Sequence, residues 1–239
     1  MQVSFQQMEM SLNQLTDETL MRQYAKSDFA AFELLYERNK GGLYRYLLRQ
    51  LHQESLAEDI FQEVWGKVIS NAESYNESAK FTTWLYKIAR NKVIDHVRHI
   101  NVVSKVIDSN NHHNAGHTDL DEEHHSTELF MHDSSLSPEK KHLQQTQAEA
   151  IDYCLNKLPA HQLDCFLLRE EGGFSLNNIA QIVDTNLEAA KSRLRVAYRN
   201  LRICLTQKMD VTAQAAELTS ATSSVAKPAA AKSGGQTYE

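Results

Sequence analysis

The sequence has few of the residues that break helices or cross-link chains. Only three prolines, three cysteines and eight glycines occur among its 239 residues. Cys154, Cys165 and Cys204 are an odd number without the spacing of metal ligands, so we expect small apolar residues and no disulfide framework. With few alternating β-type segments and many helical repeats, the pattern predicts an all-α protein of one or two domains.

The sequence also lacks membrane and catalytic signals. No apolar run is long enough to cross a bilayer, and residues 1–15 lack the basic and apolar segments of a secretory signal. We therefore expect a cytoplasmic protein without membrane insertion. A phosphate-binding glycine loop, a GxSxG elbow, an HExxH pair and a GxGxxG turn are all missing, so we expect no enzyme, no catalytic residue and no cofactor.

Residues 175–201 have the pattern of a helix-turn-helix. Ser175 is suited to cap a short helix whose apolar positions recur at helical spacing. A break follows at residues 184–186, and Asn186 is suited to cap a second helix that has Glu188 in its first turn. Ala190, Leu194, Ala197, Tyr198 and Leu201 form the apolar stripe of that second helix.

The second helix of this motif is cationic although the chain carries a net charge of −6. Glu188 is its only acid between Leu187 and Lys208, and its basic residues are Lys191, Arg193, Arg195, Arg199, Arg202 and Lys208. A basic helix in this position is typical of a recognition helix in the major groove of DNA. The alternative is a solvated, arginine-rich surface helix, which does not explain the caps and the tight break together.

A second basic segment lies near the middle of the chain. Aromatic residues surround the polar loop at residues 76–80, and basic residues follow them: Tyr75, Phe81, Trp84 and Tyr86, then Lys87, Arg90, Lys92 and Arg98. Aromatic rings beside a cationic track suit unstacked bases. For Trp84 and Tyr86, burial in the core is an equally good interpretation, which would leave them a role in shaping the loop.

Three further helical segments are predicted upstream of this loop. Thr16 starts one helix, a second covers residues 28–38, and Gly41 with Gly42 interrupts or loosens the pattern that follows. A capping box at residues 55–58 predicts the start of the next helix, whose outer face is acidic and polar. That face is unsuited to phosphates, which makes it a candidate for a protein partner or simply a solvated surface.

The pattern changes between residues 101 and 138. This segment contains seven acidic residues, six histidines and only one basic residue, Lys105, so it predicts a flexible anionic linker. Its histidines are His112, His113, His117, His124, His125 and His132. Zinc or nickel binding is an alternative to solvated low complexity, but no fixed ligand spacing supports it, and we predict no metal site.

The resulting domain organisation is two small helical domains joined by the linker. We expect an N-terminal helical domain at 1–100, the linker at 101–138, a helix-turn-helix domain at 139–209 and a disordered tail at 210–239. Pro138 is suited to the first position of the helix that follows the linker.

Both basic segments resemble those of bacterial RNA polymerase sigma factors of the extracytoplasmic-function type. The resemblance runs from about Phe29 to Arg98, through AEDIFQEVWGKV and FTTWLYKIARNKVIDHVR, and from about Glu149 to Leu205, through LPAHQLDCFLLREEGGFSLNNIAQIV and AAKSRLRVAYRNLR. It implies a subunit that binds core RNA polymerase, selects promoter DNA and helps melt it. An anti-sigma factor is a further candidate partner.

The resemblance also implies roles for individual residues. Recognition of the minus-thirty-five element is expected at Lys191, Ser192, Arg193, Arg195 and Arg199. Recognition of the minus-ten element is expected at Tyr75, Asn76, Lys80, Phe81, Trp84, Lys87, Arg90, Asn91 and Arg98. The family's polymerase-docking helix matches the polar face with Asp59, Gln62 and Glu63, and the family's linker threads polymerase channels, where acids would replace RNA. Asp184 stands where the family often has glycine, and Asp enters left-handed geometry more readily than most residues.

Two other function classes compete with this interpretation. An autonomous helix-turn-helix transcriptional regulator would account only for the last third of the chain. A helical scaffold protein that binds no DNA would account for neither basic helix.

Overall fold

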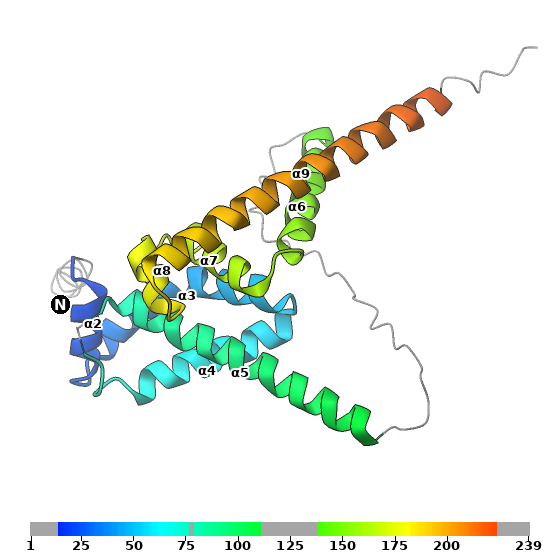
Figure 1. The fold of residues 1–239 in the computed structure, drawn as a ribbon. Coiled ribbons are helices and arrows are strands. Elements are labelled where there is room, and N and C mark those ends of the chain that lie inside the picture. Colours follow the sequence, from blue (N-terminus) through cyan, green and yellow to red (C-terminus); the bar gives the residue numbers. More distant parts are fainter. Residues whose placement is uncertain (1–13, 77–78, 111–137, 224–239) are drawn as a thin grey trace, which may run out of the picture. The chain divides into compact units, whose positions relative to one another are not determined.

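The computed structural model describes residues 14–76, 79–110 and 138–223, and within these ranges it contains helices and no strand (Figure 1). The predicted all-α class is therefore confirmed. The helices are α2 Asp17–Tyr24, α3 Phe29–Leu51, α4 Glu54–Ser70, α5 Phe81–Asn110, α6 Pro138–Asn156, α7 Ala160–Glu170, α8 Leu176–Ile182 and α9 Leu187–Ser223.

The chain forms two compact units. The first comprises Met1–Ser135 and Leu158–Tyr198, so among the described elements it holds α2 to α5, α7, α8 and the beginning of α9. The second comprises Leu136–Lys157 and Arg199–Glu239, which supply α6 and the remainder of α9. Both of the basic segments recognised in the sequence begin in the first unit.

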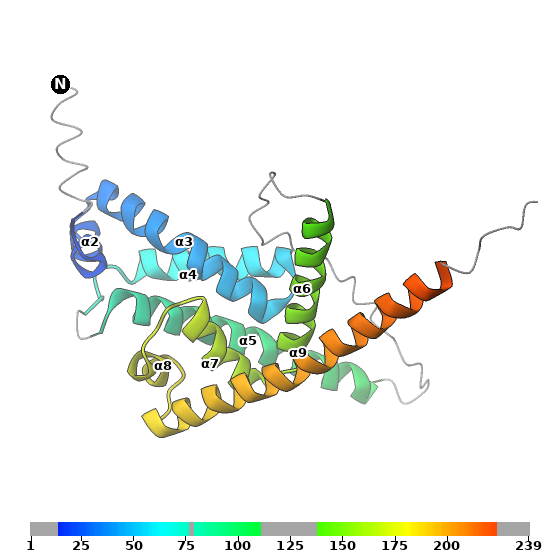
Figure 2. The same ribbon diagram turned by 90° about the horizontal axis from the view of Figure 1, so that it is seen from above.

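Helices α2 to α5 pack around one apolar core (Figure 2). Thr16 caps α2 by accepting a hydrogen bond from the Thr19 backbone N–H at 3.3 Å, as the sequence predicts. Helix α3 is continuous through Gly41 and Gly42. A Cβ at Gly42 would lie 3.0 Å from the Tyr86 hydroxyl, so glycine there lets α5 approach α3 closely.

The predicted start of α4 is wrong by two residues. Gln53 is its N-cap and makes no side-chain capping bond, whereas we expected a capping box at residues 55–58. The apolar positions of α4 still face inward, with Ile60, Val64, Trp65 and Val68 buried. Burial of this stripe, rather than the cap, therefore positions the helix.

A sharp turn joins α7 to α8. Gly173 has φ of +64°, a left-handed conformation that glycine adopts without strain. The turn tucks Phe174 into the core, where 4% of its surface is exposed, and the Arg169 side chain donates a hydrogen bond of 2.8 Å to the Phe174 carbonyl. These contacts fix the start of α8 relative to α7.

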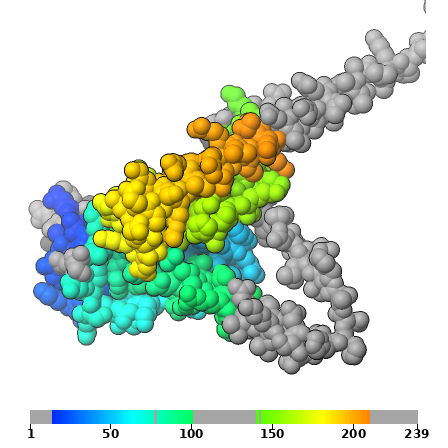
Figure 3. All heavy atoms as spheres, viewed as in Figure 1, coloured from blue at the N-terminus to red at the C-terminus, as the bar shows by residue number. Residues whose placement is uncertain are grey.

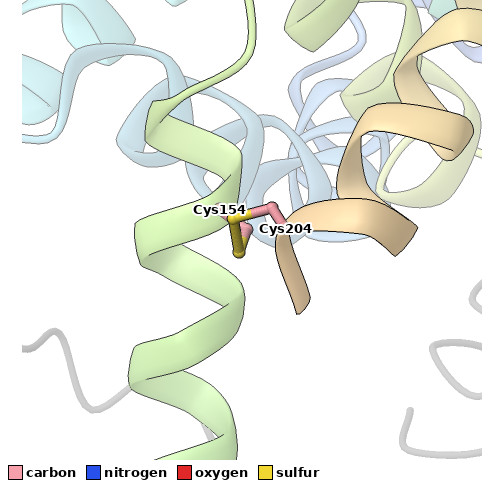
Figure 4. The surroundings of a disulfide bond; sticks show 2 residues. All are labelled: Cys154 and Cys204. Atoms are coloured by element: carbon pink, nitrogen blue, oxygen red, sulfur yellow. A yellow bond between two sulfur atoms is a disulfide. The ribbon is translucent and has the colours of Figure 1, made fainter. Parts of the chain in front are cut away.

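A disulfide joins α6 to α9 within the second unit, which corrects our expectation for two of the three cysteines. Cys154 and Cys204 are bonded with their Cα atoms 5.8 Å apart, inside the range that disulfides need (Figure 4). Fifty residues separate them, so no local spacing reveals the pair. Cys165 is the small apolar residue that we expected, because it is buried and burial raises the pKa of its thiol to about 11.

The ends of three helices fall in segments that we assigned to the linker and the tail. Helix α5 continues to Asn110, α6 begins at Pro138 as the sequence predicts, and α9 continues through residues 210–223. The remaining linker, including all six of its histidines, and residues 224–239 lie outside the described residues. Among the helices described, none is both long and apolar enough to cross a membrane.

The disulfide predicts a redox-dependent stability of the α6–α9 pair. The free energy of unfolding of oxidised wild type should exceed that of Cys204→Ser by roughly 2–4 kcal/mol, because the cross-link restricts the unfolded chain. Thermal unfolding followed by circular dichroism, with and without reductant, measures this difference. Reduced wild type should match the variant. Alkylation of all three thiols in denatured, non-reduced wild type would show that the bond does not form.

Candidate nucleic-acid interface

The helix-turn-helix forms as the sequence predicts. Ser175 caps α8 by accepting a hydrogen bond from the Asn178 N–H at 3.3 Å, and the Asn186 side chain accepts one from the Ala189 N–H at 2.7 Å at the start of α9. Between them, Asp184 has φ of +48°, which confirms the left-handed turn without glycine. The two caps and the turn orient the first residues of α9.

The predicted apolar stripe of α9 is buried except at Tyr198, which is 43% exposed, and most of the predicted DNA-binding side chains of α9 are exposed. Ala190, Leu194 and Ala197 have exposed fractions of 8% or less. The exposed candidates are Lys191, Ser192, Arg195 and Arg199, whereas Arg193 is half-buried. This separation of faces leaves a cationic surface available to a groove of DNA.

The aromatic residues predicted to hold unstacked bases lie together at the start of α5. The Tyr75 ring is 5.1 Å from the Trp84 ring and 6.0 Å from the Phe81 ring, measured between centroids. Phe81 is fully buried, while Tyr75 and Trp84 are half-buried and Asn76 and Lys80 are exposed. Tyr75 and Trp84 therefore keep part of their surface exposed, and the buried Phe81 ring packs against both.

Glu18 of α2 anchors the start of α5 and is a residue that sequence reasoning missed. Its carboxylate accepts a hydrogen bond of 3.0 Å from the Phe81 backbone N–H, which lies 63 residues away. Burial opposes its ionisation, but hydrogen bonds from Phe81, Thr16 and its own backbone, together with the charge of Lys80, outweigh burial and lower its pKa. The sequence indicated this contact only by placing Glu18 in the first turn of α2, where an acid is common.

The basic face of α5 is partly paired with acids. Lys87 Nζ lies 2.6 Å from an Asp184 carboxylate oxygen, Arg90 pairs with Asp164, and Lys92 Nζ lies 2.7 Å from a Glu63 oxygen. Asn91 and Arg98 are exposed, and Arg98 lies near Asp95 on the same helix. Asp164 was also missed, although an acid inside the apolar stretch LDCFLL was a detectable signal.

The acidic face of α4 is exposed at Asp59, Gln62 and Glu63. Its only described ion pair among these three positions joins Glu63 to Lys92 of α5. In the part of the chain that the structure describes, no group of His, Cys, Asp or Glu side chains could hold a metal ion. The histidine tract lies outside that part.

The geometry so far defines a helical protein with a capped helix-turn-helix and a separate aromatic and basic surface. Family models match both segments: sigma-70 region 2 matches residues 35–101, and sigma-70 region 4 matches residues 148–201. A probable RNA polymerase sigma factor of Haemophilus influenzae is 30% identical over 67% of this chain and 82% of that protein. An ECF RNA polymerase sigma factor SigK of Mycobacterium ulcerans is 27% identical over 78% of this chain and 91% of that protein.

Two solved structures share the fold. The sigma factor RpoE of Bartonella quintana, solved with the anti-sigma factor NepR, has a TM-score of 0.53 and 22% identity, covering 73% of this chain and 96% of that one. CnrH, solved with the cytosolic domain of CnrY, has a TM-score of 0.56 and 17% identity. The match covers 80% of this chain and 97% of CnrH.

The chain belongs to the sigma-70 family and is a sigma factor of the extracytoplasmic-function type, which directs promoter-specific transcription. Sigma factors act as subunits of RNA polymerase and are not an enzyme class. The alternative of an autonomous helix-turn-helix regulator is not favoured, because region 2 is matched as well as region 4.

The Glu18 anchor predicts a pH-dependent difference between wild type and Glu18→Gln. Because the folded-state pKa of Glu18 is lowered, its ionisation stabilises the fold above the ordinary value of 4.5 and this stabilisation is lost as the pH falls through the folded pKa. Wild type should therefore be the more stable protein at neutral pH, and the difference should shrink below about pH 4.5. Urea unfolding across this pH range measures it, and a pH-independent difference would contradict the anchor.

Proposed function

We propose that the exposed face of α9 reads the minus-thirty-five element as duplex DNA. Lys191, Ser192, Arg193 and Arg195 occupy the first turns of the helix, where side chains of a recognition helix reach base edges. Arg199 lies farther along α9 and binds phosphate. The observation that supports this assignment is the pair of caps at Ser175 and Asn186, which presents these side chains from a rigid helix.

The start of α5 is the proposed site for the minus-ten element as an opened strand. Tyr75 and Trp84 stack on an unstacked base, Asn76 and Lys80 contact it from the exposed loop, and Phe81 fixes the two rings from the core. The backbone of the strand is bound along α5 by Lys87, Arg90, Asn91 and Arg98. Single-stranded DNA suits this surface because stacking is available only after the bases separate.

The exposed polar face of α4, with Asp59, Gln62 and Glu63, docks on core RNA polymerase in this proposal.

Region 2 and region 4 form separate DNA-binding domains at 1–100 and 139–209, with the acidic segment 101–138 between them and 210–239 as a tail. The protein works in the cytoplasm, where polymerase and promoters are found, and all catalysis belongs to the polymerase. An anti-sigma factor is the proposed negative partner, since the neighbour RpoE of Bartonella quintana was solved with the anti-sigma factor NepR.

Run-off transcription with purified core polymerase tests the proposal as a whole. The full chain should confer initiation at particular promoters, and these should become visible when transcript start sites are mapped after overproduction. Core polymerase alone is the control. Tight operator binding by the chain without polymerase, combined with no change in start-site choice, would instead support an autonomous regulator.

Base-reading and phosphate-binding residues of α9 should respond differently to substitution. Arg199→Ala should weaken promoter binding by the holoenzyme uniformly across sequences and reduce the slope of log affinity against log salt by about one, because one phosphate contact is lost. Lys191→Ala and Arg195→Ala should also change the preferred minus-thirty-five sequence. Binding titrations over a salt series and a randomised promoter library measure both effects. The same uniform loss in all three variants would contradict this division.

A further inference from the structure

Helix α5 begins after a residue whose side chain cannot cap it. The backbone hydrogen bond at its start runs from the Trp84 N–H to the Lys80 carbonyl at 3.1 Å, which puts Lys80 at the capping position. A lysine side chain has no acceptor, so it cannot bind the free N–H groups of the first turn. Helices α8 and α9 differ, because Ser175 and Asn186 cap them within three residues. The start of α5 therefore needs an acceptor from another part of the chain.

Glu18 of α2 supplies this acceptor. Its carboxylate accepts the Phe81 N–H at 3.0 Å, and Phe81 is the first residue of α5. The free N–H groups at a helix N-terminus carry partial positive charge, so an ionised acid binds them better than a neutral acceptor does. Helix α2 packs against α5 there, and Figure 3 shows the blue surface of α2 next to the blue-green surface that includes the start of α5.

Helix α2 is itself held firmly against the other helices. Leu20 and Met21 are fully buried. Asp17 lies 3.0 Å from Arg38 and accepts a hydrogen bond of 3.0 Å from the Asn39 side chain, both on α3. Two adjacent acids of α2 thus serve different neighbours, Asp17 for α3 and Glu18 for α5. The match to sigma-70 region 2 begins at residue 35, so it assigns no role to α2.

The first turn of α5 carries part of the aromatic cluster. The Phe81 ring is fully buried and lies 5.9 Å from the Trp84 ring and 6.0 Å from the Tyr75 ring, measured between centroids. The Tyr75 hydroxyl also donates a hydrogen bond of 3.1 Å to the Ala79 carbonyl. Because Phe81 touches both half-buried rings, a shift of its backbone would move Tyr75 and Trp84 relative to each other. Glu18 holds that backbone.

We propose that Glu18 is a positioning residue for promoter opening: by holding the first turn of α5, it keeps Tyr75 and Trp84 in the arrangement that accepts one unstacked base. Glu18 itself does not touch DNA. A site that is ordered before the base arrives loses less conformational entropy on binding, so its affinity for opened DNA is higher. The inference rests on the proposed minus-ten role of the two rings and gives α2 a part in that role.

Two DNA fragments separate this role from a general loss of binding. Polymerase carrying the full-length chain is titrated with a promoter fragment whose minus-ten element is single-stranded, and with a duplex fragment that contains only the minus-thirty-five element. Glu18→Ala should bind the opened fragment about tenfold more weakly, as expected for one charge-assisted hydrogen bond, and the duplex fragment as well as wild type does. Glu18→Gln keeps an acceptor and should lose less. Equal losses on both fragments, or no loss on either, would overturn the proposal.

Removal of single bases connects the effect to the stacked base. In wild type, one abasic position in the single-stranded minus-ten element should weaken binding roughly tenfold, within the range of one base–aromatic stack. In Glu18→Ala the same abasic position should cost clearly less, because the stack is already impaired and the two changes are coupled. Two independent losses that simply multiply would show that Glu18 does not position the rings, and would sink the inference.

Asp17→Asn is the matched control. It alters the neighbouring acid of α2 and weakens the contacts with Arg38 and Asn39, but it leaves the bond between Glu18 and Phe81 in place. Thermal unfolding of the free chain should show destabilisation in both Asp17→Asn and Glu18→Ala, whereas only Glu18→Ala should reduce the abasic penalty. The same reduction in Asp17→Asn would mean that any loosening of α2 is sufficient, which contradicts a specific role for Glu18.

The wild-type series distinguishes this inference from the proposed function. If no abasic position weakens binding by wild type, the proposed minus-ten site is wrong, and the role of Glu18 falls with it. If wild type shows the penalty and Glu18→Ala shows it undiminished, the minus-ten site stands and only the role of Glu18 is refuted.

Discussion

The ion pair between Asp164 and Arg90 is the interaction on which the first unit depends most. The Asp164 carboxylate is nearly inaccessible to water, and its described side-chain donors come from α3 and α5. Removal of a charge from water is costly, and only this set of donors offsets the cost. Basic and polar side chains of region 2 and the buried acid of α7 are therefore matched to each other.

This match gives the same basic residues two sets of partners. Lys87 and Arg90 are paired with carboxylates in the structure, and both are proposed to bind phosphates in a promoter complex. The exposed basic face of α9 has no comparable acid among its described ion pairs, and its orientation is set by local caps at Asn186 and Ser175.

Local patterns predicted the helix-turn-helix well because its determinants lie close together in the sequence. Ser175, Asp184 and Asn186 act on backbone groups within three residues, so capping and turn preferences are sufficient to predict them. The start of α4 was mispredicted for the opposite reason, since a local capping pattern competed with burial of an apolar stripe against other helices. Most roles expected for individual residues follow from the resemblance to sigma factors, because helical periodicity does not indicate which partner a residue binds.

The sequence by itself determined the all-α class, the capped second helix of the helix-turn-helix and the clustering of aromatic and basic residues around the start of α5. Each follows from spacing within a few residues or from composition. Only the tertiary structure decided that Cys154 meets Cys204, that Glu18 anchors Phe81 and that Asp164 receives Arg90. These partners lie 50 or more residues apart. Contacts of this kind are set by how helices pack, and periodicity along one helix carries no information about the residue that will face it.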